Sequence, residues 1–95
     1  MIKIALVDDH PVTRRGIAML IESTDEIQIV MEASNGAELL KKISGTCIPE
    51  IVLLDISMPV MNGQQTMEKL LLSYPDIKII VFSFYGEEDM IINMI

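Results

Sequence analysis

Apolar and polar positions along the chain follow two alternating patterns. Short apolar runs rich in β-branched residues, each closed by acidic or turn-forming residues, are typical of strands. They cover residues 2–7, 27–33, 51–54 and 77–82. Stretches with apolar residues three or four positions apart are typical of helices that pack on a sheet. They cover residues 11 to about 23–25, 37–43, 63–74 and 87–95.

Residues at the ends of these segments support the predicted boundaries. Pro11 suits the first turn of a helix, where its missing N–H costs no hydrogen bond. Residues 34–36, Ser-Asn-Gly, are a turn or N-cap signal before the second helix, Gly45 is that helix's expected stop, and Pro75 closes the third helix. The helical spacing predicts inward-facing positions at Thr13, Ile17, Leu20 and Ile21 in the first helix, and at Met67, Leu70, Leu71 and Tyr74 in the third.

The alternation of strands and helices predicts the fold class. A βαβαβαβα order implies an α/β fold with a parallel sheet, right-handed crossovers and helices on both faces. If the strand order is 2-1-3-4, the strands at residues 2–7 and 51–54 are neighbours. Because the last predicted helix reaches residue 95 without a cap residue, we expect residues 1–95 to be one C-terminally incomplete domain.

Composition and charge narrow the classes of function. The chain has 95 residues, 51% of them hydrophobic, which suits one small domain. A formal net charge of -7 argues against a nucleic-acid surface, and no apolar run approaches the ~18 residues of a membrane span. Cys47 and His10 are each the one residue of their type, which excludes a disulfide framework and a structural zinc site. We therefore expect a cytoplasmic protein whose domain binds neither nucleic acid nor membrane.

Carboxylates at strand ends are the candidate chemistry of the sequence. Asp8 and Asp9 follow the first predicted strand and Asp55 follows the third. Ligands of open parallel sheets bind at the carboxyl ends of neighbouring strands, so we expect the three acids to converge. Arg14 and Arg15 lie beyond the first helical turn and Lys78 begins the fourth strand at the opposite end, so the cluster calls for a divalent cation. Oxygen ligands favour Mg²⁺, although each acid taken alone could be a turn former or helix cap.

One acid of the expected cluster and two residues near it support more specific expectations. Asp55 directly follows four aliphatic residues, an environment in which a carboxylate is costly unless it does chemistry, and aspartate can take up a phosphoryl group as a nucleophile. Ser83 offers a hydroxyl at the end of the fourth predicted strand, where it could equally be a turn serine. His10 is expected to be a half-exposed residue of the first helical turn and not a metal ligand.

Three segments carry a resemblance to a known family. They are ALVDDHP at residues 5–11, LLDISMPVMNG at residues 53–63 and VFSFYGEED at residues 81–89. The chain resembles the response regulator receiver domains of two-component signalling, and its Asp-Asp-His-Pro start resembles the LuxR-type subgroup. The resemblance implies a flavodoxin-like doubly wound sheet of strand order 2-1-3-4-5, of which this chain would lack the fifth strand and fifth helix.

The resemblance also implies a role for each site residue. Asp55 would be the phosphoacceptor for a sensor histidine kinase, and Ser83 would be the switch hydroxyl. Asp9, Asp55 and the backbone carbonyl of Ser57 would bind Mg²⁺ directly, with Asp8 acting through a water. Ser57 and Tyr85 would flank the path of hydrolytic water. The family's full-length members usually carry a C-terminal helix-turn-helix DNA-binding domain, so the expected output is transcriptional.

One departure from the family pattern leaves the function open. The family has a lysine at the end of a fifth strand, and none of this chain's five lysines stands at a strand's carboxyl end. Without that lysine we expect weak Mg²⁺ binding and poor phosphorylation. Without a fifth strand we expect an exposed sheet edge at residues 77–82, which favours a homodimer or a swapped helix. Two alternatives remain, an interaction module that is not phosphorylated and, less favoured, an aspartyl phosphotransferase. The chain itself is not expected to be an enzyme beyond phosphotransfer and autodephosphorylation at Asp55.

Overall fold

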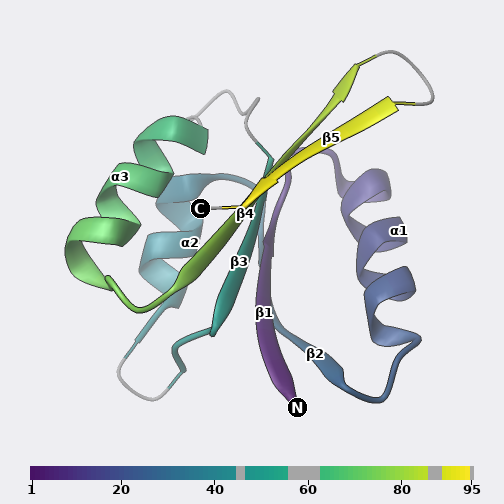
Figure 1. The fold of residues 1–95 in the computed structure, drawn as a ribbon, viewed down its shortest axis with the longest axis horizontal. Helices are drawn as coiled ribbons and strands as arrows, with labels where there is room; N and C mark the ends of the chain where they lie inside the picture. The colour runs from purple at the N-terminus through teal and green to yellow at the C-terminus, as the bar shows by residue number, and fades with distance from the viewer. Residues whose placement is uncertain (45–46, 56–62, 86–88, 95) are drawn as a thin grey trace.

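The structure is a computed structural model of a single layer of sheet covered by helices on both faces (Figure 1). It describes residues 1–44, 47–55, 63–85 and 89–94, with the backbone alone described for residues 63–64, 83–85 and 89–94. In chain order the elements are β1 (Ile2–Val7), α1 (Pro11–Glu22), β2 (Ile27–Ala33), α2 (Gly36–Lys42), β3 (Ile51–Asp55), α3 (Gly63–Ser73), β4 (Lys78–Tyr85) and β5 (Asp89–Met94). The seven elements predicted up to residue 82 are confirmed, with their boundaries shifted by three residues or fewer.

The sheet has the order β2-β1-β3-β4-β5. The first four strands are parallel, which confirms the predicted order 2-1-3-4 and the doubly wound α/β class. In β1 and β3, Val7 pairs with Leu54, so the two strands end at the same level of the sheet. The acids that follow these strands therefore emerge side by side.

The helix predicted for residues 87–95 is wrong, because Asp89–Met94 is strand β5, antiparallel to β4. β5 pairs with Ile80–Tyr85, so β4 runs three residues further than predicted and its expected exposed edge is covered from Ile80 on. A short apolar run such as Met90–Met94 fits either a helix or a strand by periodicity alone. The N–H and C=O groups along the edge of β4 can form hydrogen bonds with a neighbouring strand, which favours the hairpin.

The two faces of the sheet carry separate apolar clusters. α2 and α3 cover the face that carries Ala5, Val7, Val52, Leu54 and Ile79. α1 covers the other face, where Ala18 packs with Leu6 and Phe82. Because alternate residues of β1 enter opposite clusters, the central strand is buried on both faces, as its continuous apolar run predicts.

The inward faces of two helices differ in part from the prediction. Leu20 of α1 is 75% exposed and Leu71 of α3 is 41% exposed. On α1 the inward stripe instead passes through Ala18, which is fully buried, and the partly buried Arg14, Ile17 and Ile21. On α3, Leu70 and Thr66 are fully buried while Met67 and Tyr74 pack at the edge of the core. Each helix turns toward the sheet a face that lies about one residue position away from the predicted one. A wide apolar stripe permits this, because it does not fix which of its residues contact the sheet.

No helix in the described part of the chain is long and apolar enough to span a membrane.

Candidate functional site

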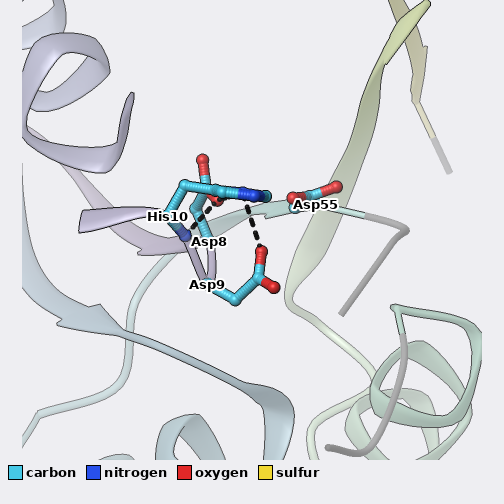
Figure 2. A group of neighbouring side chains, drawn as sticks. All are labelled: Asp8, Asp9, His10 and Asp55. Atoms are coloured by element: carbon cyan, nitrogen blue, oxygen red, sulfur yellow. Dashed lines mark hydrogen bonds and ion pairs between the residues drawn. The ribbon is translucent and has the colours of Figure 1, made fainter. Parts of the chain in front are cut away.

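The acids predicted from the strand ends converge at one edge of the sheet. Asp8, Asp9 and His10 follow β1, and Asp55 is the last residue of β3. Each of these four residues offers one ligand atom, and the four atoms all lie within 4.8 Å of one another (Figure 2). The prediction that remote carboxylates meet at this edge is therefore confirmed, and we name Asp8, Asp9, His10 and Asp55 the acid cluster.

Asp8 is buried, with 1% of the residue exposed, and hydrogen bonds hold both its backbone and its side chain. Its backbone N–H donates to the carbonyl of Ala33 in β2 over 3.1 Å. Oδ1 accepts a 2.9 Å hydrogen bond from the backbone N–H of His10, which closes a tight turn at the start of α1. Oδ2 is buried and has no hydrogen-bond partner among the described residues.

His10 lies beside both acids with most of its ring in solvent. Nδ1 is 3.0 Å from Oδ1 of Asp9 and 3.3 Å from Oδ1 of Asp8, and 70% of the His10 side chain is exposed. The contact to Asp9 is a charged pair only when the imidazole is protonated, and Oδ1 of Asp9 has no hydrogen-bond partner in the described chain. His10 was expected to be a half-exposed residue of the first helical turn, but it is the N-cap of α1, in an extended conformation just before the helix. Its position inside the cluster was not expected.

The donors of the cluster fit a hard divalent cation. Two buried carboxylate oxygens of this group of three acids, Oδ2 of Asp8 and Oδ1 of Asp9, have no hydrogen bond among the described residues, although Oδ1 of Asp9 lies 3.0 Å from Nδ1 of His10. Carboxylates this close repel one another, and a cation relieves the repulsion. Carboxylate oxygens with room for water are the ligands that Mg²⁺ prefers.

Asp55 combines burial with access to the cluster. It ends β3 after Leu53 and Leu54, and 6% of the residue is exposed. The next strand supplies Phe82 as its register partner. A carboxylate so placed is desolvated on the side of the sheet and faces the other acids on its open side (Figure 2), which is the environment expected for a carboxylate that does chemistry.

For three predicted site residues, the structure does not describe the side chain. Ser83 lies within β4, paired with Ile91 of β5, so the predicted end of the fourth strand at residue 82 is wrong. The side chain of Ser83 is outside what the structure describes. Tyr85 is the last residue of β4, and its side chain is likewise not described. Ser57 falls among residues 56–62, outside the described residues.

The arginine nearest the acids is closer than the sequence suggested. Arg14 was expected to lie beyond the first helical turn, yet its Nη1 donates a 2.9 Å hydrogen bond to the backbone carbonyl of Asp8. The expectation is wrong because helical side chains point back toward the N-terminus, which here leads to the end of β1. The signal was present in the spacing, since Arg14 shares the helical stripe of Ile17 and Ala18.

Comparison with known proteins places these features in a family. Residues 4–95 match the sequence model described as the response regulator receiver domain. The chain is 40% identical over 90 residues to the uncharacterized transcriptional regulatory protein YhcZ of Bacillus subtilis (strain 168), which covers 95% of this chain and 42% of that protein. It is 38% identical over 90 residues to the nitrate/nitrite response regulator protein NarL of Escherichia coli (strain K12), covering 95% of this chain and 41% of that protein.

A solved structure agrees with the sequence relatives. The signal receiver domain of the response regulator NarL from Mycobacterium tuberculosis superposes with a TM-score of 0.77 at 30% identity, over 92% of this chain and 69% of that chain. The chain spans about two fifths of the length of the curated relatives it matches. Activities of those whole proteins are therefore not carried over by the match.

Proposed function

The chain belongs to the response regulator receiver domain family, and we propose that it accepts a phosphoryl group on Asp55 from a sensor histidine kinase. The observation that carries this proposal is the acid cluster, in which a buried strand-end carboxylate lies within 4.8 Å of two acids from the neighbouring strand. A structural cluster of turn formers would not leave the buried Oδ2 of Asp8 without a hydrogen bond among the described residues.

The proposed transfer is a nucleophilic displacement at phosphorus. A carboxylate oxygen of Asp55 forms a bond to the phosphorus of the kinase's phosphohistidine, and the phosphorus–nitrogen bond breaks. The imidazole leaves with the electron pair of that bond and takes a proton from solvent, and Asp55 becomes an acyl phosphate. Burial against β3 and β4 limits the orientations in which the Asp55 carboxylate can meet the phosphoryl group.

Mg²⁺ is the cofactor we propose for the acid cluster. Asp9, Asp55 and the backbone carbonyl of Ser57 would hold it directly, and Asp8 would hold it through a water. When bound, it supplies positive charge that offsets the negative charge on the phosphoryl oxygens. The same acids without a cation would repel an incoming phosphate.

The proposed output is a switch read by another region or protein. Ser83 would be the hydroxyl that responds to phosphorylated Asp55, and register pairing with β3 places β4 next to Asp55. The transcriptional regulators among the relatives support a LuxR-type regulator whose DNA-binding part lies outside residues 1–95. The net charge of -7 supports a receiver that does not itself bind nucleic acid.

The positions of the lysines favour a second candidate, an interaction module that is not phosphorylated. Lys3 and Lys78 lie at the amino-terminal ends of β1 and β4, away from the acid cluster. Lys41 and Lys42 are in the last turn of α2, and Lys69 is in α3. A chain without a lysine at the phosphoryl site would bind partners through its surface and take up phosphate slowly.

Incubation with acetyl phosphate and Mg²⁺ tests the proposed function. We expect intact-mass spectra to show one added phosphoryl group on the wild-type chain, removed by hydroxylamine as an acyl phosphate is. Asp55→Asn should abolish the added mass, and Asp76→Asn, an exposed acid after α3, should not. Chelation of Mg²⁺ should also abolish it.

The outcomes separate the two candidates. Absence of any added phosphoryl group on the folded wild-type chain, with acetyl phosphate or with a phosphorylated kinase, would favour the interaction module. Equal labelling of Asp55→Asn and the wild type would overturn the assignment of Asp55.

A further inference from the structure

Arg14 is a charged residue on the inward stripe of α1. It lies one turn before Ile17 and Ala18, which pack on the sheet, and 17% of its side chain is exposed. Helical stripes that face a sheet are normally apolar, because burying a guanidinium costs free energy unless its donors are satisfied. Helix packing alone therefore does not account for an arginine at this position.

The guanidinium of Arg14 joins three segments that follow or form strands. Nη1 donates to the Asp8 carbonyl over 2.9 Å and to Oγ of Ser34 over 3.0 Å, and Nε donates to Oε1 of Glu32 over 3.3 Å. Asp8 directly follows β1, Ser34 lies in the turn before α2, and Glu32 belongs to β2. A planar fork of donors can satisfy all three in one orientation, which a lysine ammonium on a flexible stem cannot.

The contact to Asp8 fixes the peptide group that joins the two acids. The Asp8 carbonyl and the Asp9 N–H belong to one rigid plane, so a hydrogen bond to that carbonyl limits how the chain turns from Asp8 into Asp9. The Asp8 N–H is already bound to Ala33, so the Asp8 backbone is held on both sides. This limits the directions in which the carboxylates of Asp8 and Asp9 leave the backbone, and each has one oxygen within 4.8 Å of a carboxylate oxygen of Asp55.

We propose that Arg14 is a positioning residue that orients Asp8 and Asp9 for the divalent cation. This inference rests on the proposed function, because it concerns the same acid cluster. Arg14 reaches the metal ligands only through the Asp8–Asp9 peptide. Loss of its fork leaves the acids in place along the chain but lets their carboxylates diverge.

Arg15 is a matched control in the same helix. It also pairs with Glu32, but 56% of its side chain is exposed and none of its hydrogen bonds to described residues reaches the Asp8 carbonyl. Substitution of either arginine by Gln removes an ion pair to Glu32. Substitution by Lys keeps the positive charge and removes the planar fork of donors. A difference between the two variants reports the contacts that Arg14 makes and Arg15 does not, to the Asp8 carbonyl and to Oγ of Ser34.

The experiment compares Arg14→Lys with Arg15→Lys, and Arg14→Gln with Arg15→Gln, so that the conclusion does not depend on one variant folding. Urea unfolding in chelator measures the metal-free stability, and the added stability across a Mg²⁺ titration gives the Mg²⁺ Kd. We expect both Arg14 variants to raise that Kd by about tenfold, as loss of a partner that orients metal ligands does. The Arg15 variants should stay within about twofold of the wild type.

Each outcome decides between the inference and its alternatives. Arg14 variants that bind Mg²⁺ as tightly as the wild type, or Arg15 variants that lose as much affinity, would overturn the positioning role while leaving the proposed function intact. A wild-type chain that binds no Mg²⁺ would overturn both. A metal-free stability loss shared by Arg14 and Arg15 variants, with a raised Kd in the Arg14 variants alone, supports positioning over a merely structural role.

Discussion

The backbone N–H of His10 binds one oxygen of the Asp8 carboxylate, while the other oxygen of Asp8 has no hydrogen-bond partner among the described residues. The first oxygen closes the turn into α1, and the second is buried without such a partner. Asp8 therefore combines a turn-closing oxygen with a charge inside the acid cluster, and substitution can separate the two.

Asp8→Asn should separate them. The amide oxygen can still accept from the His10 N–H, while the charge that faces Asp9 and Asp55 is lost. We expect the metal-free chain to gain about 1 kcal/mol of unfolding free energy, because repulsion among buried acids is relieved. The Mg²⁺ affinity should fall about tenfold. Urea unfolding with and without Mg²⁺ measures both, with the exposed Asp25→Asn as control, and a destabilised metal-free Asp8→Asn would contradict the expectation.

His10→Ala should leave Mg²⁺ binding nearly unchanged. The contact that orders Asp8 comes from the His10 backbone, and the ring is 70% exposed. We expect a Kd within about threefold of the wild type, or roughly 0.7 kcal/mol. Isothermal titration with Mg²⁺ measures this. A loss as large as that of Asp9→Asn would mean that the imidazole is itself a ligand.

Gly16→Ala should stabilise the chain. Gly16 lies in the middle of α1, and no atom lies within 4 Å of the position that a Cβ would take. Alanine in a helix interior is more stable than glycine by about 0.5–1 kcal/mol, which raises the Tm by roughly 4 °C in a domain of this size. Thermal unfolding measures it. Lower stability would indicate that this face of α1 is covered in solution.

Leu70→Ala should destabilise the chain by about 2–5 kcal/mol, because Leu70 is fully buried between α3 and the sheet. Leu72, two residues later in α3, is 85% exposed, so Leu72→Ala should change the unfolding free energy by about 0.5 kcal/mol or less. Urea unfolding of both variants checks the inward direction of α3. Similar losses in the two variants would mean that the helix is rotated from its position here.

Glu38 should make a small contribution to stability that depends on pH. The Lys42 ammonium, 2.9 Å from Oε1, lowers the pKa of Glu38 below its ordinary value of 4.5, and the Ser34 N–H adds to this. Because the folded-state pKa is the lower one, this stabilisation is complete above about pH 4.5 and disappears as the pH falls through the folded-state value.

Glu38→Gln should therefore cost a few tenths of a kcal/mol at neutral pH, about the value of an exposed ion pair four residues apart in a helix. The difference from the wild type should vanish in strong acid. Urea unfolding across pH measures it, and Lys42→Gln should remove most of the same pH dependence. A difference that grows in acid would contradict the assigned sign.

Much of the candidate site could be predicted because strand ends obey a general rule. A continuous apolar run followed by an acid, as in Leu53–Asp55, indicates a buried parallel strand with its carboxyl end at the ligand-binding edge. The neighbourhood of Asp8 and Asp55 then follows from the strand order alone. The hairpin of β4 and β5 could not be predicted, since a short apolar segment takes the conformation that its neighbours complete.

The contacts of Arg14 depend on a local irregularity that the sequence pattern hides. The pairing of β1 with β2 shifts between Ile4 and Ala5, so that Ile4 pairs with Ile29 and Ala5 with Met31. Ile29 packs on the α1 side and Met31 on the α2 and α3 side, although strict alternation would place both on one face. The extra residue of β2 returns Glu32 to the face of α1, where it meets Arg14 and Arg15.

The sequence by itself determined the order of the first seven elements, the four parallel strands and the meeting of three acids, because side-chain periodicity and strand direction are properties of the chain. Only the tertiary structure decided which oxygens are left without hydrogen bonds, which arginine reaches the Asp8 carbonyl and which segment pairs with β4. Those outcomes depend on the register of strands and the rotation of helices, which arise from packing between segments far apart in the chain.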